Sequence, residues 1–356
     1  MTNLIRIGAV EIGAGRPVAI QSMTITDTRD AVATVNQIRE LTETGCDIVR
    51  VSVPDMEAAR AISDIRRAID IPLVADIHFD YRLALECMRR GADKIRINPG
   101  NIGDRTRVKQ VADAAKEHQI PIRIGVNGGS LSKESLMKYG GVTPDALVES
   151  AVTQAELLNL FGFYDIVVSI KASDVFLTVE ACKKFHEKGT GIPQHIGITE
   201  AGTLTSGLVK STIGIYELLR SGVGDTIRIS LTGDPVEEVV AAKTLLNAMH
   251  IEGRAQGGIE LISCPKCGRC TIDLIGIAKE IECRIYKIKT DKHFKVAVMG
   301  CVVNGPGEAR EADVGIAGGG NKKALLFKRG KPQYQVPESE ISDILMKEIL
   351  SMVIKA

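Results

Sequence analysis

From residue 18 to about residue 249, short runs of β-branched and other apolar residues alternate with longer stretches of helical periodicity. Eight such strand–helix pairs with short connections are typical of a (β/α)8 TIM barrel rather than an open doubly wound sheet. We expect strands at residues 18–24, 48–53, 73–79, 94–99, 122–127, 166–172, 195–201 and 226–232. We expect helices at residues 30–44, 55–69, 81–90, 104–118, 143–160, 174–189, 206–221 and 235–249.

Capping residues support three of these helix starts. Asp80, Thr143 and Asp234 each precede a periodic apolar stretch, and Pro follows two of them directly. Such residues satisfy the free N–H groups of a first turn, where Pro is also tolerated. A long polar loop is expected before the helix at 143–160. Residues 1–17 contain two short apolar runs, which predict a hairpin that plugs the amino-terminal end of the barrel.

The composition changes beyond residue 250, where Gly257-Gly258 has the character of a linker. We therefore predict a barrel domain over residues 1–252 and a smaller α/β domain over 253–356. The expected elements of the second domain are a helix near 271–282, strands at 296–299, 314–316 and 324–328, a turn at 318–323 and a closing helix from about 339.

Composition excludes several classes of protein. The chain has 356 residues, 44% of them hydrophobic, so it can bury a sizeable core. A net charge of +1 and only 4% aromatic residues argue against nucleic acid or an anionic membrane as partner. No apolar run reaches transmembrane length and no signal peptide is evident, which predicts a cytoplasmic protein. Its eight cysteines should then be reduced, so that a cluster of them indicates metal binding or catalysis.

The barrel strands carry polar residues where a core would be apolar. Alternate residues of a barrel strand point into the lumen, so in strand 48–53 the valines face the helices and Arg50 faces inward. The same alternation points these side chains inward: Ser52, Asp76, His78, Arg96, Asn98, Arg123, Asn127, Ser169, Lys171, Arg228 and Ser230. Asp76 cannot neutralise all five cations of this set, which are Arg50, Arg96, Arg123, Lys171 and Arg228, so we expect an anionic ligand. Arginine and lysine side chains suit phosphate oxygens. The alternative is that some are strand-end residues or form structural salt bridges.

Three residues near the strand ends are candidates for proton transfer. Asp76 and His78 could orient a hydroxyl group or move a proton. A lone histidine is more often merely hydrogen-bonded. Glu200 does not fit the alternation. Ile196 and Ile198 should face the helices, and Glu200, two residues further on, should face them too. Its position in the strand therefore gives little support for a place in the lumen.

Closely spaced thiols mark the second domain. Cys264 and Cys267 form a C-x-x-C pair, and Cys301 stands in a glycine-rich turn. A zinc ribbon would usually supply a second C-x-x-C or a pair of histidines, whereas here the nearest later donor is the oxygen of Glu308. The spacing therefore favours an iron–sulfur site, with structural zinc as the alternative.

Several motifs together resemble one family of enzymes. They are Gln21-Ser-Met-Thr24, Ala75-Asp-Ile-His-Phe79, Arg96-Ile-Asn-Pro-Gly100, Arg123-Ile-Gly-Val-Asn127, Gly197-Ile-Thr-Glu-Ala-Gly202, Ser263-Cys-Pro-x-Cys267 and Gly300-Cys-Val-Val-Asn-Gly-Pro-Gly-Glu308. Over essentially its whole length the chain resembles the 4-hydroxy-3-methylbut-2-enyl diphosphate synthases of the non-mevalonate isoprenoid pathway, in their compact bacterial form.

The resemblance implies a [4Fe–4S] cluster on Cys264, Cys267 and Cys301, with Glu308 on the fourth iron and exchanged there for the substrate oxygen. It implies reductive ring opening and dehydroxylation of 2-C-methyl-D-erythritol 2,4-cyclodiphosphate, with two electrons from a ferredoxin or flavodoxin. Glu200 would be the acid or would orient the hydroxyl group, with Asp76 and His78 nearby. A head-to-tail homodimer is also implied. The diphosphate would bind to Arg50, Arg96, Asn98, Arg123, Asn127, Lys171, Arg228 and Ser230.

Cys270 departs from the family pattern, which uses only the first two positions of this C-x-x-C-x-x-C loop, and we expect it to be a bystander. Two other interpretations remain open at this point. One is a pterin- or corrinoid-dependent methyltransferase, which would not need five convergent cations. The other is a zinc-stabilised scaffold or metal sensor without enzymatic activity.

Overall fold

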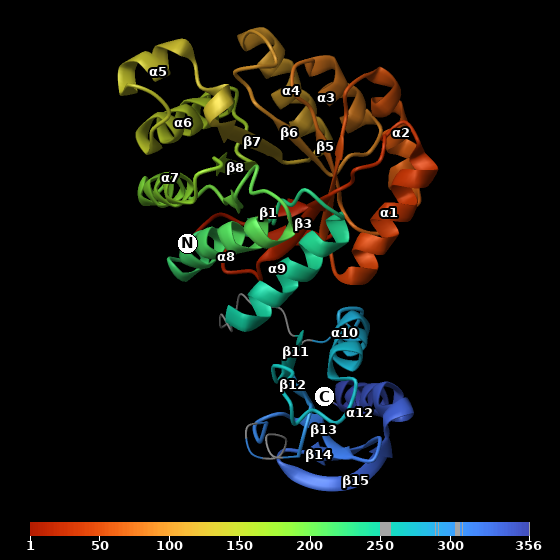
Figure 1. The fold of residues 1–356 in the computed structure, drawn as a ribbon. Helices are drawn as coiled ribbons and strands as arrows, with labels where there is room; N and C mark the ends of the chain where they lie inside the picture. The colour runs from red at the N-terminus through yellow and green to blue at the C-terminus, as the bar shows by residue number, and fades with distance from the viewer. Residues whose placement is uncertain (250–257, 289, 291, 303–306, 308, 356) are drawn as a thin grey trace. The chain divides into compact units, whose positions relative to one another are not determined.

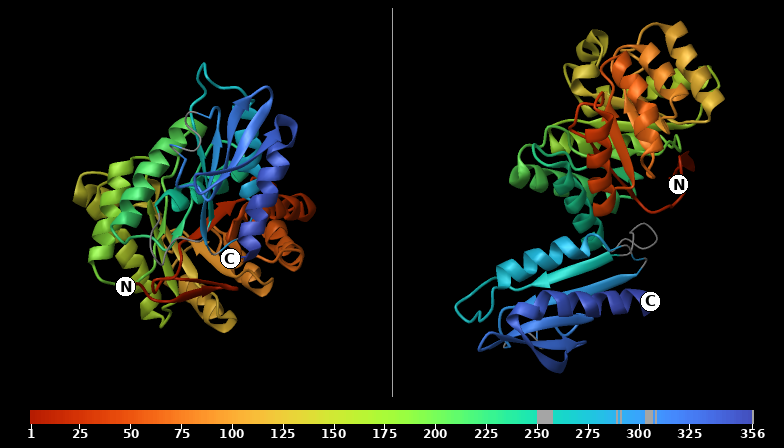
Figure 2. Two further views of the ribbon diagram at one scale, coloured as in Figure 1. Left: turned by 90° about the horizontal axis from the view of Figure 1, so that it is seen from below. Right: turned by 90° about the vertical axis from the view of Figure 1, so that its right-hand side faces the viewer.

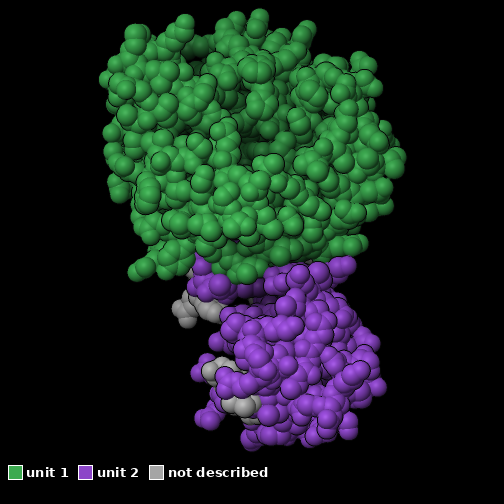
Figure 3. Space-filling model, viewed as in Figure 1, with its two compact units in different colours: residues 1–245, 251–254 green, residues 246–250, 255–356 purple. Residues whose placement is uncertain are grey.

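The computed structural model describes residues 1–249, 258–288, 290, 292–302, 307 and 309–355. They fall into two compact units, coloured separately in Figure 3. The first contains residues 1–245, and the second contains the described residues from Leu246 onward. The boundary expected between residues 252 and 253 lies outside the described residues.

The first unit is built on an eight-stranded parallel sheet (Figure 1). An isolated parallel bridge between Val168 and Gln194 joins its two outermost strands, and the Val168 N–H donates to Pro193 O at 2.9 Å. The barrel is thus nearly closed, and the predicted fold class is confirmed. Its strands are β3 (Ala19–Met23), β4 (Ile48–Ser52), β5 (Leu73–Asp76), β6 (Lys94–Ile97), β7 (Ile122–Asn127), β8 (Ile166–Lys171), β9 (His195–Ile196) and β10 (Thr226–Ile227).

Helices follow each strand, as predicted. The expected capping residues cap them, since Asp80 accepts from Arg82 N–H at 2.9 Å, Thr143 from Ala146 N–H at 3.2 Å and Asp234 from Val236 N–H at 2.9 Å. The helices are α1 (Ala31–Thr44), α2 (Met56–Arg67), α3 (Tyr81–Arg89), α4 (Arg105–His118), α5 (Lys133–Tyr139), α6 (Pro144–Leu160), α7 (Val175–Glu187), α8 (Leu204–Arg220) and α9 (Pro235–Met249).

The structure differs from the sequence expectation in three places in this unit. A short 3-10 helix (Gly128–Ser130) and α5 occupy the stretch expected to be a loop, and α5 begins after Ser132, which accepts from Ser135 N–H. The last two strands are only two residues long. The cause lies at Gly197, whose φ is 155° and where a Cβ would stand 2.2 Å from Arg228 O. This close approach, possible only for glycine, bends the chain away from the ladder.

The amino-terminal hairpin covers one end of the barrel. It consists of β1 (Ile5–Ile7) and β2 (Val10–Ile12), which pair in antiparallel register. Its three isoleucines form one buried cluster with Ala19, Ile48, Val74 and Val167. Each of these partners is the first or second residue of a barrel strand, so the hairpin plugs the amino-terminal end as predicted.

The second unit contains a five-stranded sheet in sequential order. The first three strands are parallel and the last two are antiparallel. The predicted α/β character is confirmed, but β11 and β15 were missed, and Gly258 begins β11 instead of a linker. The elements are β11 (Gly258–Ser263), α10 (Leu274–Ile285), β12 (His293–Met299), β13 (Val314–Gly320), β14 (Lys323–Lys328), β15 (Lys331–Pro337), a 3-10 helix (Glu338–Glu340) and α12 (Ile341–Lys355).

Alternation along these strands gives the sheet two different faces. Val296, Val298 and Ile316 belong to the larger buried cluster, in which Ile281 of α10 and Leu345 of α12 also lie. Figure 2 shows helices α10 (cyan) and α12 (blue) lying along this sheet. The intervening strand residues belong to a smaller cluster, made of Ala297, Met299, Ala309, Ala312, Ala317 and Phe327. Two helices therefore cover one face, and Ala309 and Ala312 pack against the other.

Candidate active site

A cavity of about 230 Å³ opens among the inward-facing residues at the carboxyl ends of the barrel strands. This end is where barrel enzymes carry their sites. A larger hollow of about 740 Å³ lies on the outer surface of α6 and α7, but no barrel-strand residue lines it. The smaller cavity is lined by Arg50, Asp76, His78, Arg96, Arg123, Val126, Asn127, Ser169, Lys171, Thr199, Arg228 and Ser230.

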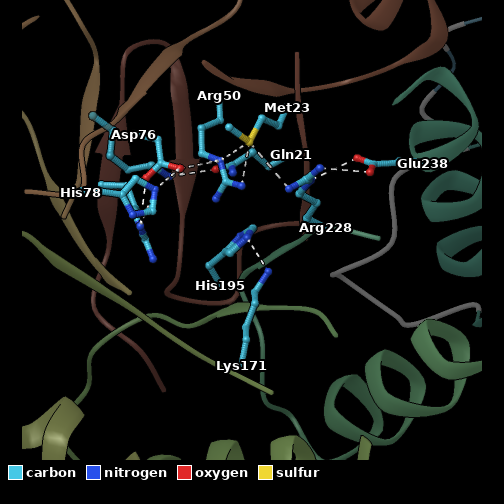
Figure 4. Close-up of polar contacts among 11 residues, drawn as sticks. Gln21, Met23, Arg50, Asp76, His78, Lys171, His195, Arg228 and Glu238 are labelled. Atoms are coloured by element: carbon cyan, nitrogen blue, oxygen red, sulfur yellow. Dashed lines mark hydrogen bonds and ion pairs between the residues drawn. The ribbon is translucent and has the colours of Figure 1, made fainter. Parts of the chain in front are cut away.

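Asp76 holds two of the five cations and the histidine (Figure 4). Its carboxylate lies 3.1 Å from Arg96 Nη1, 3.7 Å from Arg50 Nε and 3.6 Å from His78 Nε2. Burial by itself raises the pKa of Asp76, but the charge of Arg50, the His78 hydrogen bond and the charge of Arg96 together hold that pKa well below its usual range. Asp76 is therefore a carboxylate at neutral pH.

Glu238 is a buried carboxylate that sequence reasoning missed. It accepts from Arg228 Nε at 3.1 Å and Nη2 at 3.0 Å, from Ser22 Oγ at 3.0 Å and from Leu231 N–H at 3.0 Å. Its acceptor oxygens are thus used by a bidentate arginine and two further donors. A signal was present in the sequence, because Glu238, Ala242 and Leu245 have the helical spacing of one buried face of α9.

Met23, at the end of β3, is a second unpredicted contact. Its thioether sulfur lies 3.0 Å from Arg50 Nε, 2.9 Å from Arg50 Nη2 and 3.8 Å from Arg228 Nη1. The sulfur is a weak acceptor that carries no charge. It therefore orients Arg50 without neutralising it (Figure 4).

Arg123 and Lys171 differ from the other cations because they have no carboxylate in ion-pair distance among the described residues. Arg123 is 1% exposed, and its Nε and Nη1 have no hydrogen-bond partner in the described part of the chain. Burial, followed by the charges of Arg50 and Arg96, lowers the pKa of Arg123. A guanidinium nevertheless keeps its proton in proteins, so Arg123 carries a positive charge in surroundings that disfavour it.

Lys94 adds a further cation next to this group. It begins β6 and is fully buried, and its Nζ lies 3.4 Å from Gln21 Oε1. Burial and the charges of Arg123 and Arg50 lower the pKa of Lys94 well below its usual value. The whole environment thus favours negative charge.

The structure does not bring all the predicted residues into the cavity. Asn127 and Ser230 line it, whereas Asn98 does not, because its Oδ1 accepts from Gly100 N–H at 3.0 Å in the turn after β6. Glu200 is exposed, has a left-handed φ of 53° and does not line the cavity. It follows the break at Gly197, so strand phase could not have located it.

The cysteine loop and the turn after β12 meet at one edge of the second sheet. β11 and β12 are parallel neighbours with Ser263 opposite Val298, so Cys264 and Cys301 follow the same ends of adjacent strands. The N–H of Gly300 donates to Cys264 Sγ at 3.2 Å. Cys301 is buried and Cys267 is exposed. Parallel pairing is thus what joins residues separated by more than thirty positions in the sequence.

By their chemistry, the thiols of Cys264, Cys267 and Cys301 would be suitable donors for a sulfur-ligated metal centre. The backbone N–H of Arg269, and then its side chain, lower the pKa of Cys267, which favours the ligating thiolate. Within the described residues no group of three or more His, Cys, Asp or Glu side chains is arranged to hold a metal ion, and Glu308 lies outside them.

Cys270 makes protein contacts of its own beside Gly300. Its thiol donates to Ile272 O at 3.2 Å, and it packs against the apolar cluster around α10. A Cβ on Gly300 would stand 2.8 Å from its sulfur, so the cysteine fills the space beside the turn.

Fold and site together define a class: a parallel barrel with a cavity lined by cations, followed in the chain by an α/β domain that carries several thiols. Residues 2–243 match the GcpE TIM-barrel domain, and residues 260–351 match the GcpE protein C-terminal domain. The chain therefore belongs to the GcpE family, and the resemblance seen in the sequence is confirmed.

Curated relatives match along nearly their whole length. The chain is 57% identical to 4-hydroxy-3-methylbut-2-en-1-yl diphosphate synthase (flavodoxin) of Caldanaerobacter subterraneus subsp. tengcongensis, over 99% of this chain and 98% of that protein. It is 56% identical to the protein of the same name from Clostridium perfringens, over 98% of each chain.

A solved structure shares the barrel. Dihydropteroate synthase from Stenotrophomonas maltophilia matches 70% of this chain and 99% of its own, with a TM-score of 0.52 and 14% identity. At that identity the likeness shows the fold alone. No helix in the described residues is both long enough and apolar enough to cross a membrane.

Proposed function

We propose that this chain is an iron–sulfur oxidoreductase that converts 2-C-methyl-D-erythritol 2,4-cyclodiphosphate to 4-hydroxy-3-methylbut-2-enyl diphosphate. Two electrons and one proton enter, two carbon–oxygen bonds break, a carbon–carbon double bond forms and one water leaves. The opened diphosphate gains one negative charge. The names and near-complete coverage of the curated relatives support this reaction.

The observation that carries the proposal is the charge imbalance in the barrel cavity. Five cations line it, and the carboxylates of Asp76 and Glu238 compensate two of them, which leaves an excess of three positive charges. A buried excess of this kind is costly unless an anion shares the site. A diphosphate supplies the missing negative charge, and the opened product carries one more negative charge than the cyclic substrate.

The arrangement assigns a role to each set of side chains. Arg50, Arg96 and Arg228 are fixed by carboxylates and orient the diphosphate. Arg123 and Lys171 are uncompensated, and they stabilise the charge that develops on it. We propose that Asn98, Asn127 and Ser230 assist as hydrogen-bonding groups, of which Asn98 would have to leave its present turn.

Proton delivery to the departing hydroxyl needs an acid near the cavity. His78 lines the cavity with Nε2 3.6 Å from the Asp76 carboxylate, and this position makes its imidazole one candidate for the proton donor. Glu200 keeps its proposed role as acid from the resemblance, although its side chain is exposed in this structure.

Cys264, Cys267 and Cys301 would hold a [4Fe–4S] cluster, with Glu308 as the fourth ligand. When bound there, the cluster would supply the two electrons and a Lewis-acidic iron. Single-iron, zinc and cluster sites differ in metal and sulfide content, so analysis of anaerobically purified protein tests this assignment. Colourless protein with one zinc per chain would reject it.

The relatives' name includes flavodoxin, and we propose flavodoxin as the electron donor, with ferredoxin as the alternative. We also propose a head-to-tail homodimer and a domain boundary between residues 252 and 253. The deciding assay combines protein, cyclic diphosphate and reduced flavodoxin without oxygen, and follows the product by mass spectrometry. Absence of product with an intact cluster would contradict the proposed function.

A further inference from the structure

Lys171 lies within a contact chain that crosses three successive barrel strands. It ends β8, and its Nζ is 3.1 Å from Nε2 of His195, the first residue of β9. The other ring nitrogen, Nδ1, is 2.7 Å from Oγ1 of Thr226, the first residue of β10. His195 and Thr226 are direct partners in the ladder, which explains how their side chains meet.

The donor and acceptor roles in this contact chain follow from the hydrogen-bonding capacity of each group. Burial, followed by the charges of Arg123, Arg50 and Arg228, lowers the pKa of Lys171 well below its usual value, and a diphosphate in the cavity would favour the ammonium form. In that form Nζ has three donors and no acceptor, so Nε2 of His195 accepts from Lys171. The ring proton then resides on Nδ1, from which it is donated to Thr226 Oγ1. Burial and the neighbouring charges of Lys171, Arg123, Lys94 and Arg50 lower the pKa of His195 well below its usual value, which keeps the ring neutral.

The surroundings of Lys171 leave room for its contact with His195. A Cβ at Gly197 would stand 3.0 Å from Lys171 Nζ, so the glycine at the β9 break leaves room for the ammonium. His195 and Thr226 are both fully buried, so no solvent competes for the ring. Figure 4 shows the imidazole of His195 facing the end of the Lys171 side chain.

The partner of Lys171 differs in kind from those of the other held cations. Arg50, Arg96 and Arg228 are oriented by carboxylates, which also cancel part of their charge. Lys171 is oriented by a neutral ring and, among the described residues, meets no carboxylate. The ring therefore holds Nζ in place without adding a negative charge, and the other N–H groups of Lys171 stay available.

We propose that His195 is a positioning residue that aims the uncompensated ammonium of Lys171 at the diphosphate of the substrate. This inference rests on the proposed function for the identity of the ligand, and it gives a role to a residue that lies behind the cavity lining. Thr226 fixes the ring tautomer that the role requires.

The test uses a probe whose binding does not depend on turnover, inorganic pyrophosphate, titrated calorimetrically into the anaerobically purified protein. His195→Leu removes the acceptor at similar volume and should weaken binding roughly tenfold, the value of one charge-assisted hydrogen bond. His195→Gln keeps an acceptor amide and should stay within about threefold of the unchanged protein.

A thermodynamic cycle separates positioning from a structural role. In a Lys171→Met background, His195→Leu should cause no further loss of affinity, because the group that it positions is already gone. An equal loss in both backgrounds, or unchanged affinity in folded His195→Leu, would overturn the proposal. Circular dichroism and thermal melting verify folding.

A second measurement keeps the proposal testable if His195→Leu does not fold. Nitrogen NMR of the unchanged protein labelled at histidine should show Nδ1 of His195 protonated and Nε2 bare, and the opposite tautomer would contradict the proposal. If wild-type protein binds pyrophosphate but does not convert the cyclic diphosphate, the proposed function fails while the result on His195 stands.

Discussion

The barrel cavity and the cysteine edge are two sites built in opposite ways. The cavity is held together by protein contacts, because Asp76 and Glu238 form ion pairs with three arginines on the barrel strands. The cysteine edge brings Cys264 and Cys301 to adjacent strand ends, but the described residues form no closed set of metal ligands. Ion pairs among side chains hold the first site, and we propose that a bound cluster would complete the second.

The difference follows from what each site has to hold. Cations repel one another, so a cage of them exists only where protein carboxylates and packing force it, and the stored repulsion is released on anion binding. Thiols do not repel in this way, and a metal itself supplies the energy that gathers them. Substitutions should therefore affect binding in the barrel and cofactor retention in the second domain.

The largest effect should come from the cysteine edge. Cys301→Ser should lose essentially all bound iron and all activity, because a serine oxygen is a poor ligand for a cluster iron. Cys270→Ser is the matched control on the same edge. Since the Cys270 thiol is hydrogen-bonded to Ile272 O, this variant should keep a normal cluster and normal turnover. A clusterless Cys270→Ser protein would overturn the ligand assignment.

Arg123→Met should uncouple stability from binding in the barrel. Two charge-assisted hydrogen bonds to the diphosphate would be lost, so that affinity should fall by about 3 kcal/mol, roughly 100-fold. The free energy of unfolding should be unchanged or higher, because a buried and uncompensated charge is removed. Calorimetric titration and urea unfolding measure the two quantities. Arg67→Met on the exposed face of α2 should change neither, and a destabilised Arg123→Met protein with normal affinity would contradict the account.

Asp76→Asn should show the opposite behaviour, with lower stability. Breaking this buried network should cost about 3 kcal/mol at pH 7. Because the folded-state pKa of Asp76 is lowered, its contribution is complete above the unfolded value and is lost as pH falls toward the folded value. The difference in free energy of unfolding between the unchanged protein and Asp76→Asn should thus be constant from pH 7 to pH 5 and should become smaller below about pH 4. Urea unfolding at a series of pH values measures it, and a gap that widens in acid would be inconsistent.

The smallest effect is expected at Met23. Met23→Leu keeps the volume but removes the sulfur acceptor of Arg50, which should lower pyrophosphate affinity only about twofold. The same calorimetric titration measures it. A loss as large as that of Arg123→Met would mean that the neutral thioether, rather than Asp76, controls the direction of Arg50.

Sequence reasoning located the barrel cations because strand alternation is a local property. Arg50, Arg96, Arg123, Lys171 and Arg228 are all found lining the cavity. It could not supply their partners, since the contact between Arg228 and Glu238 depends on how α9 packs over β10. Nor could it locate Glu200, because the close approach of Gly197 to Arg228 O ends the strand before that residue is reached.

At the cysteine edge the sequence identified the thiols but not what joins them. The parallel pairing of β11 with β12 brings the two loops together, and β11 was missed because its glycine start resembles a linker. The assignment of Glu308 lies outside the described residues and stays a prediction.

The most direct test of the account is the iron, sulfide and zinc content of anaerobically purified protein, with its visible spectrum before and after addition of the cyclic diphosphate. The account predicts brown protein with about four irons and four sulfides per chain and a spectrum that changes with substrate. Colourless, zinc-loaded protein whose spectrum is indifferent to the compound would contradict it, and would leave the barrel cavity as an anion site without redox chemistry.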